Sequence, residues 1–187
     1  FEASVREALQ QHVRGLLAAV AGVGTVEVTP QGTLGMVTPK GNLERPEVAL
    51  DVSALGGMYA GQITLVGHGR SLGVRNQGTL EASAGDLVIT AAGRLDNAQL
   101  IRSAGALRLA GDGIRSLGAL VSEGDLSVHG ADVILQGDVH SGGDMSLGAT
   151  AGSLYLAGAY VEAGRALSLS AAEHLGVYDS QVRGQEM

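Results

Sequence analysis

The chain has 187 residues, a mass of 18.9 kDa, a formal charge of -7 and a pI near 5.1. It has no cysteine, which excludes disulfides and thiolate metal sites, and no basic run, which argues against nucleic acid and anionic lipid as partners. Glycine contributes 30 residues and aromatic residues only 3 %, so we expect many turns around a narrow aliphatic core. No apolar run approaches the roughly 20 residues of a membrane-spanning helix.

Residues 1–22 are predicted to form a short N-terminal amphipathic helix. Ser4 and Glu7 have the spacing of a capping box, apolar residues recur at helical spacing, and Gly22 would end the helix. The segment has no basic, apolar leader, so we expect no targeting sequence in it and interpret the chain as a piece of a longer protein.

Residues 23–47 are predicted to be a loop-rich lead-in. The pattern changes here to short β-like pieces, of which residues 25–29 are an example. Three prolines interrupt these pieces, namely Pro30, Pro39 and Pro46.

From residue 48 onward the sequence repeats itself. A glycine is followed two residues later by an apolar residue and, after two more, by an aliphatic residue. The glycines that open these units are Gly61, Gly85, Gly105, Gly124, Gly143 and Gly164, and the last unit has one extra residue. The steps between them are 24, 20, 19, 19 and 21 residues, too short for a βαβ crossover, so we expect successive copies to stack as parallel strands.

Two further apolar columns keep the same period. The second column comprises Leu95, Ile114, Val133, Leu154 and Leu175. The third comprises Leu100, Leu120, Val139, Val161 and Val182. Each period therefore holds three short strands, and the residues that alternate with the columns, such as Ser127, Ser146 and Ser168, are expected to point outward.

These columns predict an all-β fold, a right-handed parallel β-helix (a β-solenoid) over residues 48–187, with about six coils of three short strands each. At a strand spacing of about 4.8 Å, the coils between Gly61 and Arg183 would form a rod about 29 Å long. No coil buries its own inward face, so the aliphatic side chains depend on the coils above and below for burial. We therefore expect neighbouring coils to fold cooperatively.

Polar residues at the corners are predicted to serve turns. One column follows the corner glycines and comprises Asp86, Ala106, Asp125, Asp144 and Arg165. Aspartate suits a tight turn there, and Arg165 would offset the repulsion between carboxylates. Asn76 and Asn97 form a second ladder, which is expected to end early because the later coils carry Ser116, Leu135, Leu156 and Val177.

No residue pattern indicates a chemical site. The five histidines lack metal-binding spacing; they are His12, His68, His129, His140 and His174. Residues 142–144 match a calcium-binding solenoid repeat once, at the wrong period, and no nucleophile elbow or phosphate-binding loop occurs. We therefore predict no catalytic, cofactor-binding or metal-binding residues and no enzymatic activity.

Residues 49–61 read ALDVSALGGMYAG, followed by ITLVG at 63–67 and GVRNQG at 73–78. This stretch resembles filamentous haemagglutinin-type proteins, large exoproteins of two-partner secretion that include contact-dependent inhibition toxins. The units AGDL at 84–87 and GRLDN at 93–97 are similar to the haemagglutinin repeats of that family. The resemblance covers about residues 48–183 and places them just after the secretion domain.

The resemblance implies a structural stalk segment of a secreted surface adhesin or contact-dependent inhibition protein. It implies export by an outer-membrane two-partner secretion transporter, location at the bacterial cell surface, and a receptor or glycan on a host or neighbouring cell as target of the parent protein. The chain departs from the family in having no Asn-Pro-Asn secretion motif, and His68–Ser71 replace a Thr-Glu-containing stretch. The predicted N-terminal helix is not explained by the resemblance.

Two alternatives stay open. A carbohydrate-active parallel β-helix enzyme would require Asp86, Asp125 or Asp144 to meet another carboxylate across a groove. An inactive fragment of an exoprotein would be distinguished from a stalk by the sequence that flanks the chain.

Overall fold

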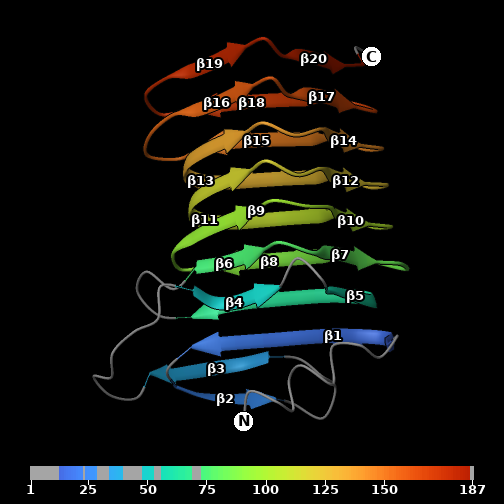
Figure 1. The fold of residues 1–187 in the computed structure, drawn as a ribbon, viewed down its shortest axis with the longest axis vertical. Helices are drawn as coiled ribbons and strands as arrows, with labels where there is room; N and C mark the ends of the chain where they lie inside the picture. Colours follow the sequence, from blue (N-terminus) through green and yellow to red (C-terminus); the bar gives the residue numbers. More distant parts are fainter. Residues whose placement is uncertain are drawn as a thin grey trace.

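The computed structural model describes residues 13–22, 24–28, 34–39, 48–52, 56–68 and 73–185. Within these ranges every regular element is a β-strand, and 18 strands form one sheet that winds around a central axis (Figure 1). The coils stack from β1 toward β19 and β20, near the C-terminus. The predicted all-β solenoid is therefore confirmed.

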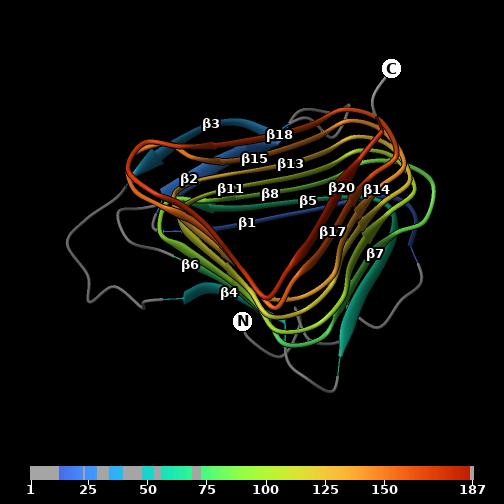
Figure 2. The same ribbon diagram turned by 90° about the horizontal axis from the view of Figure 1, so that it is seen from above.

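The winding sheet has three faces, and the cross-section is close to a triangle (Figure 2). Face A comprises β1 (Val13–Gly22), most of β5 (Gly57–His68), β8 (Leu87–Ala91), the first parts of β11 (Leu107–Ser116) and β13 (Leu126–Leu135), β15 (Met145–Ala149) and β18 (Leu167–Ala171). Face B comprises β4 (Val48–Val52), β6 (Gly73–Asn76), β9 (Arg94–Asn97), the last parts of β11 and β13, β16 (Leu154–Ala157) and β19 (Leu175–Tyr178). Face C comprises the start of β5, β7 (Thr79–Ala82), β10 (Ile101–Ser103), β12 (Leu120–Ser122), β14 (Val139–Ser141), β17 (Tyr160–Ala163) and β20 (Gln181–Gly184).

The solenoid is right-handed. Seen from the C-terminal end, the chain passes from face C to face A and then to face B in a counter-clockwise direction while it rises toward the viewer (Figure 2). Every pairing between coils is parallel, as the repeat period predicted. This handedness is the one that right-twisted strands favour when a chain crosses over to a parallel neighbour.

Two of the three predicted apolar columns are confirmed residue by residue. On face A, Leu107 pairs with Leu126 and Leu126 with Met145, and all three side chains are buried. On face B the second column is in register from Leu95 to Leu175. The inward side chains of successive coils therefore form one continuous dry core, to which each coil contributes a layer.

The third predicted column is wrong by one residue at its first member, Leu100. Ile101, not Leu100, pairs with Leu120 and is fully buried, whereas Leu100 lies outside the strand. At the corner between faces B and C, three residues lie between the last inward residue of face B and the first inward residue of face C, so Ile101 follows Asn97 as Leu120 follows Ser116. Since strand side chains alternate, a shift of one residue would turn Leu100 outward.

The predicted helix is wrong for residues 13–22, which form β1. This strand pairs in parallel with β5, so that Leu17 lies beside Ile63 and Ala19 beside Leu65. Leu17 and Ala19 pack against the core while Leu16 and Ala18 are exposed, which is the two-residue period of a strand. The edge of β5 supplies hydrogen-bond partners and apolar surface, and these override the local helical spacing. The predicted capping box lies outside the described residues.

The lead-in contains a short antiparallel pair outside the main sheet. β2 (Gly24–Val28) pairs with β3 (Leu34–Pro39), with an irregularity in register between Val26 and Val28. The β-like piece predicted at residues 25–29 thus falls mainly within β2. Figure 1 shows this pair beside β1, at the end of the rod opposite β20.

Candidate functional surfaces

The corner between faces C and A carries the predicted column of aspartates. Each carboxylate accepts a hydrogen bond from the backbone N–H at the equivalent position of the next coil. The distances are 2.8 Å from Ala106 N to Asp86, 2.9 Å from Asp144 N to Asp125, and 3.2 Å from Ala166 N to Asp144. The column therefore joins successive coils, which agrees with the predicted turn role.

Arg165 is displaced from the position predicted for it. Ala166 takes the place in the column, because the last unit has one extra residue, and Met145 N donates to the Ala166 carbonyl. Arg165 lies beside the column, with Nη2 3.1 Å from Asp125 and Nε 3.6 Å from Asp144. It offsets the two carboxylates as predicted. All three groups are largely exposed, so each ion pair contributes only about 0–1 kcal/mol.

The asparagine ladder is present and ends where the sequence indicated. Asn76 Nδ2 donates to Asn97 Oδ1 at 2.8 Å, and Asn97 Nδ2 donates to Ser116 Oγ at 2.9 Å. Both asparagines are buried, and their Oδ1 atoms accept from Gly78 N and Gln99 N two residues onward. The next coil places Leu135 at this position, so the ladder stops there.

A ladder of buried serines at the corner between faces C and A was missed in the sequence. Ser103, Ser122 and Ser141 lie in register on face C and are almost fully buried. Their hydroxyls donate to backbone carbonyls of the corner at 2.8–3.1 Å. The signal was available, because each serine precedes the first inward residue of face A by four positions in three successive coils. These hydroxyls add a second hydrogen bond to carbonyls that also accept backbone N–H groups of neighbouring coils, as Gly105 O does from Gly124 N and Gly143 O from Arg165 N.

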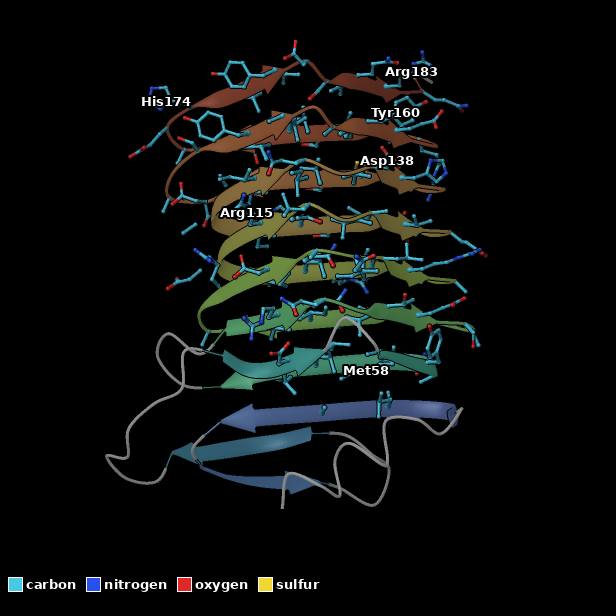
Figure 3. All side chains as sticks on the ribbon, in the orientation of Figure 1. Met58, Arg115, Asp138, Tyr160, His174 and Arg183 are labelled. Atoms are coloured by element: carbon cyan, nitrogen blue, oxygen red, sulfur yellow. The ribbon has the colours of Figure 1, made fainter. Side chains whose placement is uncertain are left out.

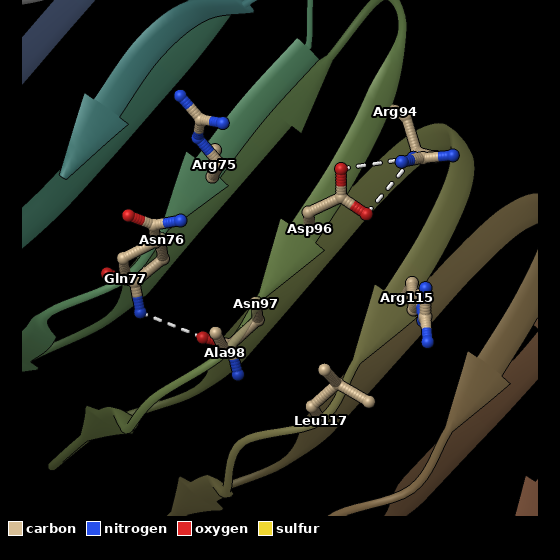
Figure 4. Close-up of a pocket in the computed structure, with 9 residues that line it drawn as sticks. All are labelled: Arg75, Asn76, Gln77, Arg94, Asp96, Asn97, Ala98, Arg115 and Leu117. Atoms are coloured by element: carbon tan, nitrogen blue, oxygen red, sulfur yellow. Dashed lines mark hydrogen bonds and ion pairs between the residues drawn. The ribbon is translucent and has the colours of Figure 1, made fainter. Parts of the chain in front are cut away.

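Face B carries a column of alternating charge near its N-terminal end. The column comprises Asp51, Arg75, Asp96 and Arg115. Arg75 Nη2 lies 2.5 Å from Asp51, and this hydrogen bond, followed by the charge of Asp51, raises the pKa of Arg75 above its ordinary value. Arg94 Nε lies 3.0 Å from Asp96, and the residues around them line a hollow of about 210 Å³ (Figure 4). Opposite charges thus meet between coils.

Face C carries a second polar group, around Glu162. His140 Nδ1 lies 3.4 Å from its carboxylate, and the Tyr160 hydroxyl donates to it at 3.3 Å. Arg183 lies 5.8 Å from the centre of the Tyr160 ring, and both residues are labelled in Figure 3. These side chains come from three successive strands of face C, with His140 on β14, Glu162 on β17 and Arg183 on β20. They therefore also connect coils.

The histidines are not brought together. His129 is on face A, where Nε2 lies 3.2 Å from Ser146 Oγ, while His140 is on face C and His174 lies at the start of face B. His12 and the side chain of His68 lie outside the described residues. Over the described part of the chain, no three His, Cys, Asp or Glu side chains could hold a metal ion together. The same residues contain no helix long and apolar enough to cross a membrane.

Comparison with known proteins identifies relatives over most of the chain. The haemagglutinin repeat family matches residues 19–99 and 102–177. A toxin CdiA of Yersinia pestis is 50 % identical over 82 residues, which are 43 % of this chain and 2 % of that protein. A 16S rRNA endonuclease CdiA of Enterobacter cloacae is 34 % identical over 163 residues, 87 % of this chain and 4 % of that protein.

A third relative, tRNA nuclease CdiA-2 of Burkholderia pseudomallei, is 43 % identical over 79 residues, 42 % of this chain and 2 % of that protein. The chain thus spans only a few per cent of the length of these relatives. No solved structure matches it significantly. Because the family match covers most of the sequence and coincides with the coils, the chain belongs to the haemagglutinin repeat family and is a repeat segment of the kind found in CdiA exoproteins.

Proposed function

We propose that this segment is a structural stalk in an adhesin or contact-dependent inhibition protein that is exported by two-partner secretion and displayed at the cell surface. The observation that supports this most is the unbroken register of the inward columns, which run from Ile63 on β5 through Leu167 on β18. A rod built this way gains length by adding coils, and each coil needs only its neighbours for stability.

The outward side chains support the same proposal. Ion pairs between neighbouring coils include Arg75 with Asp51, Arg102 with Glu123 and Arg108 with Asp86. They are exposed and distributed over the rod, so they add small increments of stability at each step. A surface organised in this way strengthens a rod along its axis.

We also propose that the segment is not an enzyme. The carboxylates that could have formed a catalytic pair accept hydrogen bonds from backbone N–H groups, and arginines flank them. A glycosidase or lyase needs one carboxylate free to exchange a proton and another to act as base or nucleophile. In the parent protein, toxin activity and recognition of a receptor or glycan on the target cell would then belong to other segments.

The test is a deletion of one coil, residues 124–142, from the parent exoprotein, expressed with and without its outer-membrane transporter. This deletion removes one full 19-residue period and brings Gly143 to the place of Gly124. We expect export, surface display and target-cell activity to persist, and all three to require the transporter. Deletion of residues 124–133 removes a fraction of a period and should abolish display.

Two results would contradict the proposal. Normal display with lost activity after the one-coil deletion would mean that this coil carries a site and is not a spacer. Transporter-independent display would contradict two-partner secretion.

A further inference from the structure

We draw no further inference here: the strongest candidate, the hollow on face B that is lined by Arg75, Arg94 and Arg115, carries nothing because carboxylates of the same face already pair with two of these arginines and nothing in the described part of the chain shows what would occupy it.

Discussion

Leu126→Asp tests the central packing claim at one residue. Leu126 is 1 % exposed and lies in register between Leu107 and Met145, so its side chain is surrounded by apolar groups from three coils. Removal of a buried leucine side chain alone costs about 2–5 kcal/mol. The aspartate adds the cost of a charge without a partner in a dry column, or of the proton uptake that neutralises it.

The expected total exceeds about 5 kcal/mol, which is comparable with the whole stability of an ordinary domain. Because each coil depends on its neighbours, the loss should spread from β13 to the adjacent coils. Leu126→Ala is a milder variant whose free energy of unfolding can be measured. We expect it to remain folded and to lose about 2–5 kcal/mol of stability.

Urea unfolding followed by circular dichroism gives the free energies, and amide hydrogen exchange shows which coils open. The control is Ser127→Asp, which introduces the same charge at the adjacent, outward position and should change stability by less than about 0.5 kcal/mol. Equal effects of the two aspartates, or an unchanged melting temperature for Leu126→Asp, would refute the inward assignment of this column.

Four smaller changes test the corners and the surface. Asn97→Ala should cost about 1–3 kcal/mol in urea unfolding, since it leaves the buried Asn76 Nδ2 without its partner while Ser116 Oγ keeps its bond to the Gly118 carbonyl. A loss below about 0.5 kcal/mol would argue against the ladder. Gly118→Ala should cost about 1–3 kcal/mol or more, because its Cβ would overlap the Gln99 carbonyl oxygen. Gly113→Ala is the control and should be neutral or slightly stabilising in the same assay, since the nearest atom to its new Cβ would be in the Arg94 side chain, at 3.7 Å. Equal losses of stability in the Gly113 and Gly118 variants would contradict the close approach at Gly118. Arg165→Ala should cost less than about 1 kcal/mol, and a loss that persists in 1 M salt would rule out the exposed ion-pair explanation.

The repeat period made most of the fold predictable. Residues that recur every coil must occupy equivalent places, so the glycine-led units placed Leu107, Leu126 and Met145 in one column without any knowledge of the corners. The same alignment predicted where the asparagine ladder ends, because Leu135 occupies the position that Asn97 occupies two coils earlier.

Features set by tertiary context were not predictable in the same way. Residues 13–22 have apolar side chains that fit a helix or a strand, and only the free edge of β5 decides between them. Ile101 occupies the place predicted for the adjacent aliphatic residue Leu100, and Ala166 occupies the place predicted for Arg165 because the last unit has one extra residue. The repeat period therefore predicts residue positions well within strands and less well at corners.

The surface features differed in how well the sequence revealed them. The corner aspartates were identified from their position after glycine, but their bonds to the next coil depend on the coil spacing. The stacked rings of Tyr155 and Tyr178 on face B, whose centres lie 6.2 Å apart, were not identified at all, since the two residues lie in adjacent outward columns of successive coils. An alignment of the outward positions, made in the same way as that of the inward ones, would have brought them together.

The most direct test of in-register stacking is a distance measured along the rod. The chain has no cysteine, so cysteines introduced at Thr64 and Ser168 can carry spin labels specifically. These residues share one outward column of face A, and five strand spacings separate them, which predicts a narrow distribution centred near about 24 Å. A broad distribution, or a mean beyond about 35 Å, would show that consecutive coils are not superposed and would contradict the rod.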